Sequence, residues 1–270
     1  MESHTVHGGN GVDLRVRTAG AGRPLLFVHG LSQSALCWRE QFDSDLTDEY
    51  RLVAVDCRGH GESAKPRDAY DDSALWAADV RAVVEALGLD DLVLVGWSYG
   101  GLVVLDYLER YGTDRVAGLA LVGAVSGIGT EAATEVLGEE YLDLLPGFVS
   151  TDAEESVAAL RAFVDLCTHD ELPPADRYFV LGYNVVVPPY VREGLRGRTV
   201  THDAELDSLD VPALLVHGAE DAVVLPEASR RHEARLDDAE HVTYPATGHS
   251  PFLEAPERFN DDLRSFAAGL

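Results

Sequence analysis

The stretch that decides the fold runs from residue 92 to residue 105 and reads Leu92-Val-Leu-Val-Gly-Trp-Ser98-Tyr-Gly-Gly-Leu-Val-Val-Leu105. Its first four residues predict a buried strand, and its last four predict the start of an apolar helix. Between them lies the pattern Gly-x-Ser-x-Gly, centred on Ser98. A sharp strand-to-helix turn strains the backbone at its centre and leaves no room for neighbouring side chains, so it needs these glycines. The pattern predicts a nucleophilic serine, with an ordinary glycine-rich turn as the alternative.

Further apolar runs of the same kind are spread along the chain. They are Leu25–Val28, Leu52–Val55, Leu119–Val122 and Ala213–Val216. Helical patterns separate them, such as the apolar spacing between Ser73 and Gly88. Continuous apolar strands that alternate with helices are typical of a parallel sheet covered on both faces. The sequence therefore predicts an α/β fold with a mostly parallel, doubly wound sheet.

This alternation breaks between Gly127 and Val200. The stretch predicts four helices, punctuated by prolines, over Glu131–Leu145, Ala153–Cys167, Ala175–Asn184 and Tyr190–Arg196. Only Val185–Val187 has a short β-like pattern. Strand signals return at Val211 and at Glu240–Tyr244, and a last helix is expected near Pro256–Ala268. We expect residues 127–200 to form an inserted helical cap on a core made of residues 1–126 and 201–270.

Two later segments supply the partners that a serine nucleophile requires. A serine hydroxyl is a weak nucleophile, so it needs a base, and the base needs an orienting acid. The sequence His217-Gly-Ala-Glu220-Asp221 follows one predicted strand, and Gly248-His249-Ser250 follows another. The order Ser98, Asp221, His249 is one of the known chain orders of such a triad. Glu220 is the alternative acid.

Two more motifs carry a family resemblance. His29-Gly-Leu-Ser32 follows the strand at 25–28, and Asp56-Cys-Arg-Gly-His-Gly-Glu-Ser63 follows the strand at 52–55. With these motifs in order, the chain resembles the α/β-hydrolases along essentially its whole length. The resemblance implies their fold, with an inserted lid at residues 127–200.

The resemblance also implies residue roles. Ser98 is the nucleophile, His249 the general base and then acid, and Asp221 the orienting acid. The family's Gly-x-x-Asp spacing favours Asp221 over its neighbour Glu220. The backbone N–H groups of Leu31 and Tyr99 would form the oxyanion hole. No metal or organic cofactor is implied.

Other residues of the motifs have structural interpretations as well. We expect His29 to fix the oxyanion loop, His60 to make local turn hydrogen bonds, and His217 to be a satisfied histidine near a strand end. Trp38 and Trp97 are candidates for the substrate pocket wall. For both tryptophans, packing in the core is the alternative.

The reaction follows from the same motifs. Serine at this position argues against the dehalogenase and epoxide hydrolase branches, which use aspartate. We expect a carboxylic ester hydrolase acting on a small or medium, largely uncharged ester. A cofactor-free perhydrolase of the chloroperoxidase type, or an enol-lactonase, at the same triad is the alternative. A receptor on this fold that binds without catalysis is a further alternative, disfavoured by the complete triad.

The net charge of the chain limits the kinds of partner that it can bind. The 270 residues include 47 acids against 21 basic residues, a net charge of −26, which disfavours nucleic acid and anionic membrane surfaces. Residues 130–172 hold 11 acids and one arginine, Arg161, whereas Arg192, Arg196 and Arg198 are the only basic cluster of the cap. An acidic lid should repel anionic substrates.

The basic residues carry a second signal. Lys65 is the only lysine, and every other basic residue is arginine. A GC-rich genome explains the small number of lysines but not the excess of acidic residues, so we expect adaptation to a salt-rich cell.

Cys37, Cys57 and Cys167 form no ligand pattern and are expected to be reduced. With no signal sequence or membrane span visible, a cytoplasmic location is expected. The oligomeric state stays open.

Overall fold

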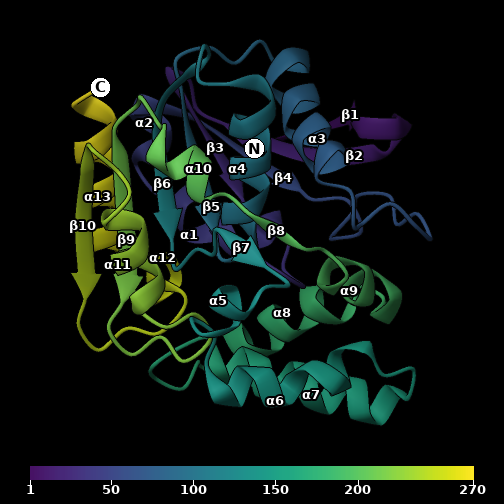
Figure 1. The fold of residues 1–270 in the computed structure, drawn as a ribbon. Coiled ribbons are helices and arrows are strands. Elements are labelled where there is room, and N and C mark those ends of the chain that lie inside the picture. Colours follow the sequence, from purple (N-terminus) through teal and green to yellow (C-terminus); the bar gives the residue numbers. More distant parts are fainter.

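An eight-stranded sheet forms the centre of the structure, a computed structural model that describes residues 1–270 (Figure 1). Across the sheet, the strands are β1 (Glu2–His7), β2 (Asp13–Ala19), β4 (Tyr50–Asp56), β3 (Arg23–Val28), β5 (Leu92–Trp97), β6 (Val116–Val122), β9 (Ala213–Gly218) and β10 (Ala239–Tyr244). From β4 to β10 all neighbours are parallel, and β2 is antiparallel to both β1 and β4. The prediction of a mostly parallel sheet is confirmed.

The hairpin of β1 and β2 was not expected from the sequence. Along β2, fully buried residues alternate with residues that are partly or fully exposed. This alternation is typical of a strand with one solvated face, whereas the apolar runs used for the prediction mark strands buried on both faces.

Helices cover the two faces of the sheet and create two separate cores. On one face, α3 (Ser73–Ala86) packs against α4 (Tyr99–Tyr111), and their apolar residues belong to one core cluster. The other cluster contains aromatic residues of a 3₁₀ turn (Ala35–Trp38), α1 (Arg39–Phe42), α12 (Pro251–Glu254) and α13 (Pro256–Ala268). Shorter helices are α2 (Leu46–Glu49), α10 (Asp203–Asp207) and α11 (Glu227–Glu233), and a second 3₁₀ turn spans Gly9–Gly11. None of the helices combines the length and the apolar character needed to cross a lipid bilayer.

Five helices lie between the two short strands β7 (Gly127–Ile128) and β8 (Val200–Thr201): α5 (Glu131–Thr134), α6 (Glu139–Val149), α7 (Ala153–Leu166), α8 (Pro174–Val185) and α9 (Pro189–Arg196). In Figure 1 they gather below the sheet, at the edge where its parallel strands end. The two-residue strands β7 and β8 pair antiparallel, so the first and last residues of the segment lie side by side.

The structure corrects three details of this segment. The single helix expected over Glu131–Leu145 is divided into α5 and α6, because the chain between them runs extended beside residues 222–224. There Leu137 bridges to Val224, and a side chain at Gly138 would lie only 1.9 Å from the Ala222 carbonyl. Pro146 does not end the helix but lies in the last turn of α6, although it has no N–H to donate to the carbonyl four residues earlier. The β-like residues after Asn184 are not a strand: Val185 is the last residue of α8.

Candidate active site

The predicted site residues meet at one edge of the sheet. Parallel strands present their carboxyl ends on the same side, and binding sites of α/β sheets form there. Ser98 directly follows β5, Asp221 follows β9, and His249 follows β10. The loop after β3 carries Leu31. Residues more than a hundred positions apart in the chain are therefore neighbours in space.

Ser98 lies on a strained turn between β5 and α4. Its backbone has φ of 55° and ψ of −121°, a conformation that residues other than glycine rarely adopt. A side chain at Gly100 would lie 2.2 Å from the Val28 carbonyl oxygen, and one at Gly30 would lie 2.9 Å from Cβ of Ser98. The Ser98 N–H donates to the Val122 carbonyl at 3.0 Å. These close approaches explain the need for glycine and hold the serine at the tip of the turn.

Asp221 is fully buried and surrounded by hydrogen-bond donors. Nδ1 of His249 donates to its Oδ2 at 2.7 Å. Its Oδ1 accepts the backbone N–H groups of Val223 and Val224, each at 2.9 Å. Nε2 of His217 lies 3.2 Å from Oδ2. The neighbouring Glu220 is exposed and takes no part in this arrangement.

The electrostatic setting keeps Asp221 ionised. Burial by itself would raise the pKa of this carboxyl, but the facing imidazoles of His249 and His217 outweigh burial and lower the pKa to about 2. An ionised Asp221 accepts the proton on Nδ1 of His249, which leaves Nε2 of His249 as the nitrogen free to accept a proton. The contact with His217 was not expected, because the sequence gives no sign that two histidines share one carboxylate.

The other side of the His249 ring is free. Nε2 is buried and has no hydrogen-bond partner in the chain, and no hydrogen bond joins it to the Ser98 hydroxyl in this structure. Such bonds are often long before substrate binds and tighten in the complex. Trp97 holds the backbone in place, since its Nε1 donates to the His249 carbonyl at 2.8 Å.

Ser98 opens on a cavity of about 160 Å³. Most of its lining is apolar and comes from the β6–β7 connection, α5, α6 and the loop after β9: Val125, Ile128, Ala133, Leu137, Tyr141, Leu142, Leu145, Val223 and Val224. Arg196 is its one charged lining residue, and no carboxylate lines it. Leu31 and Tyr99 also line it, and their backbone N–H groups donate to no acceptor within the chain. The cavity thus offers a hydroxyl, two unused donors and an apolar wall.

Two histidines hold the loop that carries Leu31. His29 donates from Nδ1 to the Gly30 carbonyl at 2.9 Å and accepts the Cys57 N–H at Nε2 at 3.0 Å. Nε2 of His60 accepts the N–H of Ser32 at 3.2 Å. Burial lowers the pKa of both imidazoles, so each is neutral and acts as donor and acceptor at once.

The expectation that Trp38 and Trp97 wall the substrate cavity is wrong. Trp38 is fully buried, with its ring centre 4.3 Å from that of Phe252 and 5.0 Å from that of Phe27. Trp97 packs on the same Phe252 at 4.7 Å and lies 5.4 Å from the His249 ring. Both belong to the core cluster on the α12–α13 face. The sequence cannot tell on which side of the sheet a tryptophan near the motif lies.

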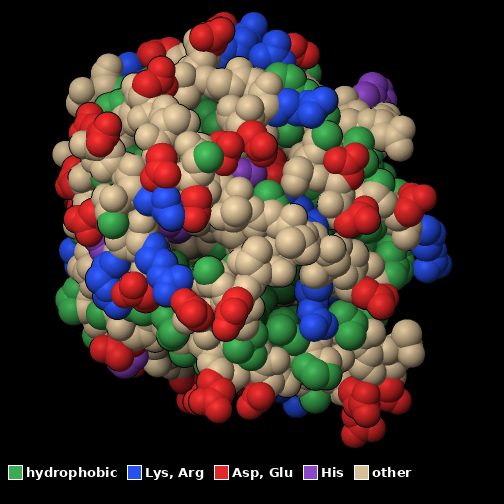
Figure 2. Space-filling view, viewed as in Figure 1, with side chains coloured by type: hydrophobic (Ala, Val, Ile, Leu, Met, Phe, Trp, Pro, Cys, Tyr) green, Lys and Arg blue, Asp and Glu red, His purple; other side chains and the backbone are tan.

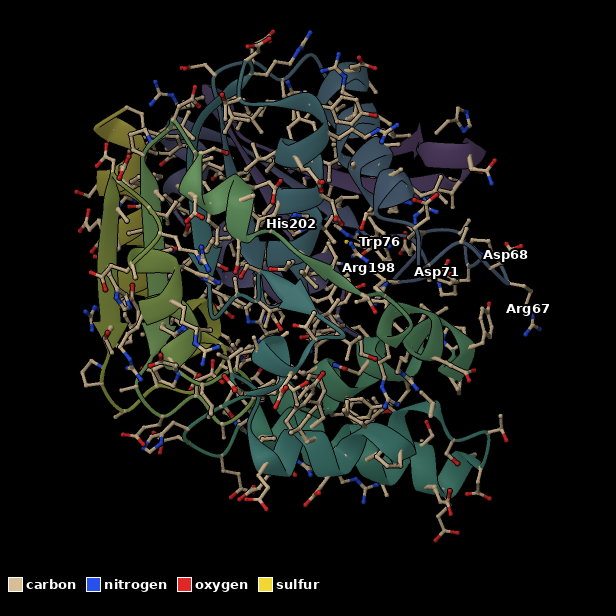
Figure 3. The ribbon with its side chains drawn as sticks, in the orientation of Figure 1. Arg67, Asp68, Asp71, Trp76, Arg198 and His202 are labelled. Carbon is tan, nitrogen blue, oxygen red and sulfur yellow. The ribbon has the colours of Figure 1, made fainter.

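The basic cluster expected in the cap does not form a surface patch. Arg192 and Arg198 are buried, and only Arg196 is exposed. Arg198 pairs with the fully buried Asp106 at 2.7 Å, and Figure 3 shows it beside Trp76 of α3.

The one group of side chains placed to ligate a metal is Asp106, Glu109 and His202. Both oxygens of Asp106 already accept Nη2 of Arg198, so a guanidinium already supplies the positive charge there.

Comparison with known proteins agrees with this architecture. Residues 23–256 match the family described as alpha/beta hydrolase fold, so the chain belongs to that family and is an α/β-hydrolase enzyme. It is similar to an esterase from Rhodococcus sp. ECU1013, with a TM-score of 0.95, 40% identity and full coverage of both chains.

Curated relatives point to the same branch. A non-heme haloperoxidase from Rhodococcus erythropolis is 31% identical, over 95% of this chain and 96% of its own. A bifunctional esterase/perhydrolase from Acinetobacter calcoaceticus is also 31% identical, with the same coverage.

Proposed function

We propose that this protein hydrolyses carboxylic esters through an acyl-enzyme formed on Ser98. The observation that carries the proposal is the arrangement of His249: Nδ1 is bonded to the ionised Asp221, Nε2 is unpartnered, and the ring lies 5.4 Å from that of Trp97, the residue before Ser98. A base oriented by a buried acid, next to a serine on a strained turn, is the arrangement that acyl transfer requires.

The reaction would proceed in two steps. Ser98 attacks the ester carbonyl while Nε2 of His249 takes its proton, and His249 then protonates the departing alcohol. The N–H groups of Leu31 and Tyr99 stabilise the oxyanion, and each such donor contributes about 3 kcal/mol of barrier lowering where it has been measured. Water, activated by His249, then releases the acid. Asp221 holds the imidazole and stabilises its charged form throughout.

The cavity supports a small, uncharged substrate. Its volume of about 160 Å³ is below the roughly 300 Å³ at which pockets for drug-sized ligands begin. Its wall is apolar and lacks carboxylates, so a short acyl chain gains contacts there without losing hydration of a charge. Acidic side chains gather on the outer surface of α6 and α7, at the bottom of Figure 2, and disfavour anionic substrates at a distance.

We extend the proposal to the organisation of the chain. Residues 127–200 would act as a cap on a core of residues 1–126 and 201–270. The pairing of β7 with β8 supports this division, because it closes the base of the inserted segment. The wall of the cavity contributed by α5 and α6 would then be the part of the site that sets acyl preference.

Perhydrolysis at the same triad is a second candidate. Two relatives at 31% identity favour it, one a haloperoxidase without haem and one an esterase/perhydrolase. Hydrogen peroxide would replace water as the nucleophile that attacks the acyl-enzyme, and the product would be a peracid instead of a carboxylic acid. A lactone would be opened by the same first step.

A labelling experiment tests the proposal. We expect a fluorophosphonate to label Ser98 and to abolish hydrolysis of p-nitrophenyl acetate, whereas S98A remains folded, unlabelled and inactive. Peracid formation from acetate and hydrogen peroxide, assayed in parallel, measures the second candidate. Full esterase activity in S98A would exclude the assignment.

A further inference from the structure

Arg192 on α9 is buried but faces no acidic partner. Its side chain is 1% exposed. Nε donates to the Ser32 hydroxyl at 2.8 Å, Nη1 to the Phe148 carbonyl at 2.7 Å, and Nη2 to the Val187 carbonyl at 2.5 Å. Nη1 also lies 3.4 Å from the hydroxyl of Ser156. One guanidinium therefore joins α6, α7 and the end of the α8 segment to a residue of the loop after β3.

The lack of an acidic partner sets Arg192 apart from the other buried arginines of the chain. The other two fully buried arginines each face an aspartate: Arg58 pairs with Asp79 and Arg198 with Asp106, both at 2.7 Å. A buried charge without a counter-charge is costly, and only several good hydrogen bonds make it tolerable. Burial lowers the pKa of Arg192 to about 10, which leaves the guanidinium charged at neutral pH. A buried charged residue that costs stability in this way is more often found at a functional site than in an ordinary core.

The residue that Arg192 holds on the core side is itself strained. Ser32 is fully buried and has φ of 63°, in the left-handed region that favours glycine. Its backbone N–H donates to His60, and its hydroxyl accepts Nε of Arg192. Ser32 directly follows Leu31, a residue that lines the cavity and whose N–H donates to no acceptor within the chain. The Leu31 N–H belongs to the peptide group shared with Gly30, whose carbonyl accepts the Gln33 N–H at 3.3 Å across a turn that has Ser32 as its third residue. The conformation of Ser32 closes this turn and therefore helps to set the direction of that peptide group.

We propose that Arg192 is a positioning residue that orients the Leu31 N–H for catalysis by holding Ser32. This inference rests on the proposed function, because it assigns Leu31 to the oxyanion hole. The guanidinium would couple the loop after β3 to the proposed cap, since the same side chain that fixes Ser32 also binds carbonyls of the α6 and α8 segments. A cap that is displaced would release Ser32 and weaken the oxyanion hole.

The two ends of this contact can be removed separately. R192M keeps length and apolar bulk but has no donors, and R192K keeps the charge without the Nε group. S32A removes only the acceptor and leaves the backbone strain as it is. R161M is the matched control, because Arg161 is an exposed arginine on α7 that forms no ion pair.

We expect R192M, R192K and S32A each to lower kcat for p-nitrophenyl acetate by about tenfold or more, approaching the roughly 100-fold loss seen on removing an oxyanion donor. KM should change by less than about threefold, because the donor acts mainly on the transition state. The double variant R192M/S32A should lose no more than the worse single variant, because both act through one contact. R161M should retain wild-type kinetics.

A wild-type kcat in S32A overturns the proposal, even if R192M fails to fold. Multiplied losses in the double variant, or full activity in R192K, overturn it as well, since Arg192 would then act by another route. Failure of the proposed function looks different: the wild-type protein and R161M would both be inactive towards esters, and Ser98 would not react with the fluorophosphonate.

Discussion

Nδ1 of His249 lies 2.7 Å from Oδ2 of Asp221, and this contact joins the loops after two neighbouring parallel strands. The carboxylate is buried, accepts two backbone N–H groups as well, and stays ionised because its pKa is lowered to about 2. The imidazole is thereby kept in the tautomer whose Nε2 can take a proton. Much of the proposed chemistry depends on this one pair.

Removing the charge of Asp221 should stop catalysis without unfolding the protein. D221N retains the shape but favours the wrong tautomer of His249, and we expect kcat to fall about 10⁴-fold. The neighbouring Glu220 gives a matched control, since E220Q changes an exposed carboxylate of the same loop and should leave kcat unchanged. Steady-state kinetics with circular dichroism checks both. Loss of activity in E220Q with retention in D221N would reverse the assignment of the acid.

Buried histidines should make the protein sensitive to mild acid. Burial, with His217 nearby, lowers the pKa of His232 to about 3, whereas an unfolded histidine titrates near 6.5. A lowered folded pKa gives stability that is complete above pH 6.5 and is lost as the pH falls towards 3. The free energy of unfolding should therefore decrease by up to about 1.4 kcal/mol per pH unit for this residue.

The variant H232Q isolates this effect. Glutamine does not titrate, but it can still bond the Ser126 hydroxyl that His232 contacts at 3.0 Å. Urea unfolding between pH 6.5 and 4.5 should show a shallower decline for H232Q than for the wild type. H169Q, at an exposed histidine, should follow the wild-type curve. Parallel curves for H232Q and wild type would contradict the prediction.

Acyl preference should follow the size of the cavity. Leu145 of α6 lines it, so L145A adds space next to Ser98. We expect kcat/KM for p-nitrophenyl octanoate, relative to the acetate ester, to rise about tenfold or more, since each methylene accommodated in an apolar pocket changes discrimination by a factor of this order. L144A removes a side chain of the same helix that does not line the cavity, and it should leave the ratio unchanged. An unchanged ratio in L145A would exclude α6 as the acyl wall.

Salt should stabilise the protein. The net charge of −26 causes self-repulsion in the folded state, and ions shorten its reach to a Debye length of about 3 Å at 1 M. We expect the melting temperature to rise markedly between ~0.1 M and ~2 M KCl, and thermal unfolding followed by circular dichroism measures it. A flat or falling response would favour genome composition as the origin of the acidic, lysine-poor sequence.

Sequence reasoning was most successful where local rules are strict. The strands buried on both faces, such as β5 and β9, are continuous apolar runs, and α13 was expected at Pro256–Ala268 with the bounds that the structure has. The hairpin of β1 and β2 was missed because one of its faces is solvated. The break between α5 and α6 was missed because its cause, the approach of Gly138 to Ala222, lies in a distant loop.

The sequence alone determined the chain order of the strands buried on both faces and the turn that presents Ser98, because apolar runs and glycines are requirements of the local backbone. Only the tertiary structure decided which side chains face which. It placed Asp221 instead of Glu220 against His249, moved Trp38 and Trp97 into the core, and brought Arg192 to Ser32 across 160 positions of chain. Such contacts depend on strand register and helix packing, which a local pattern does not contain.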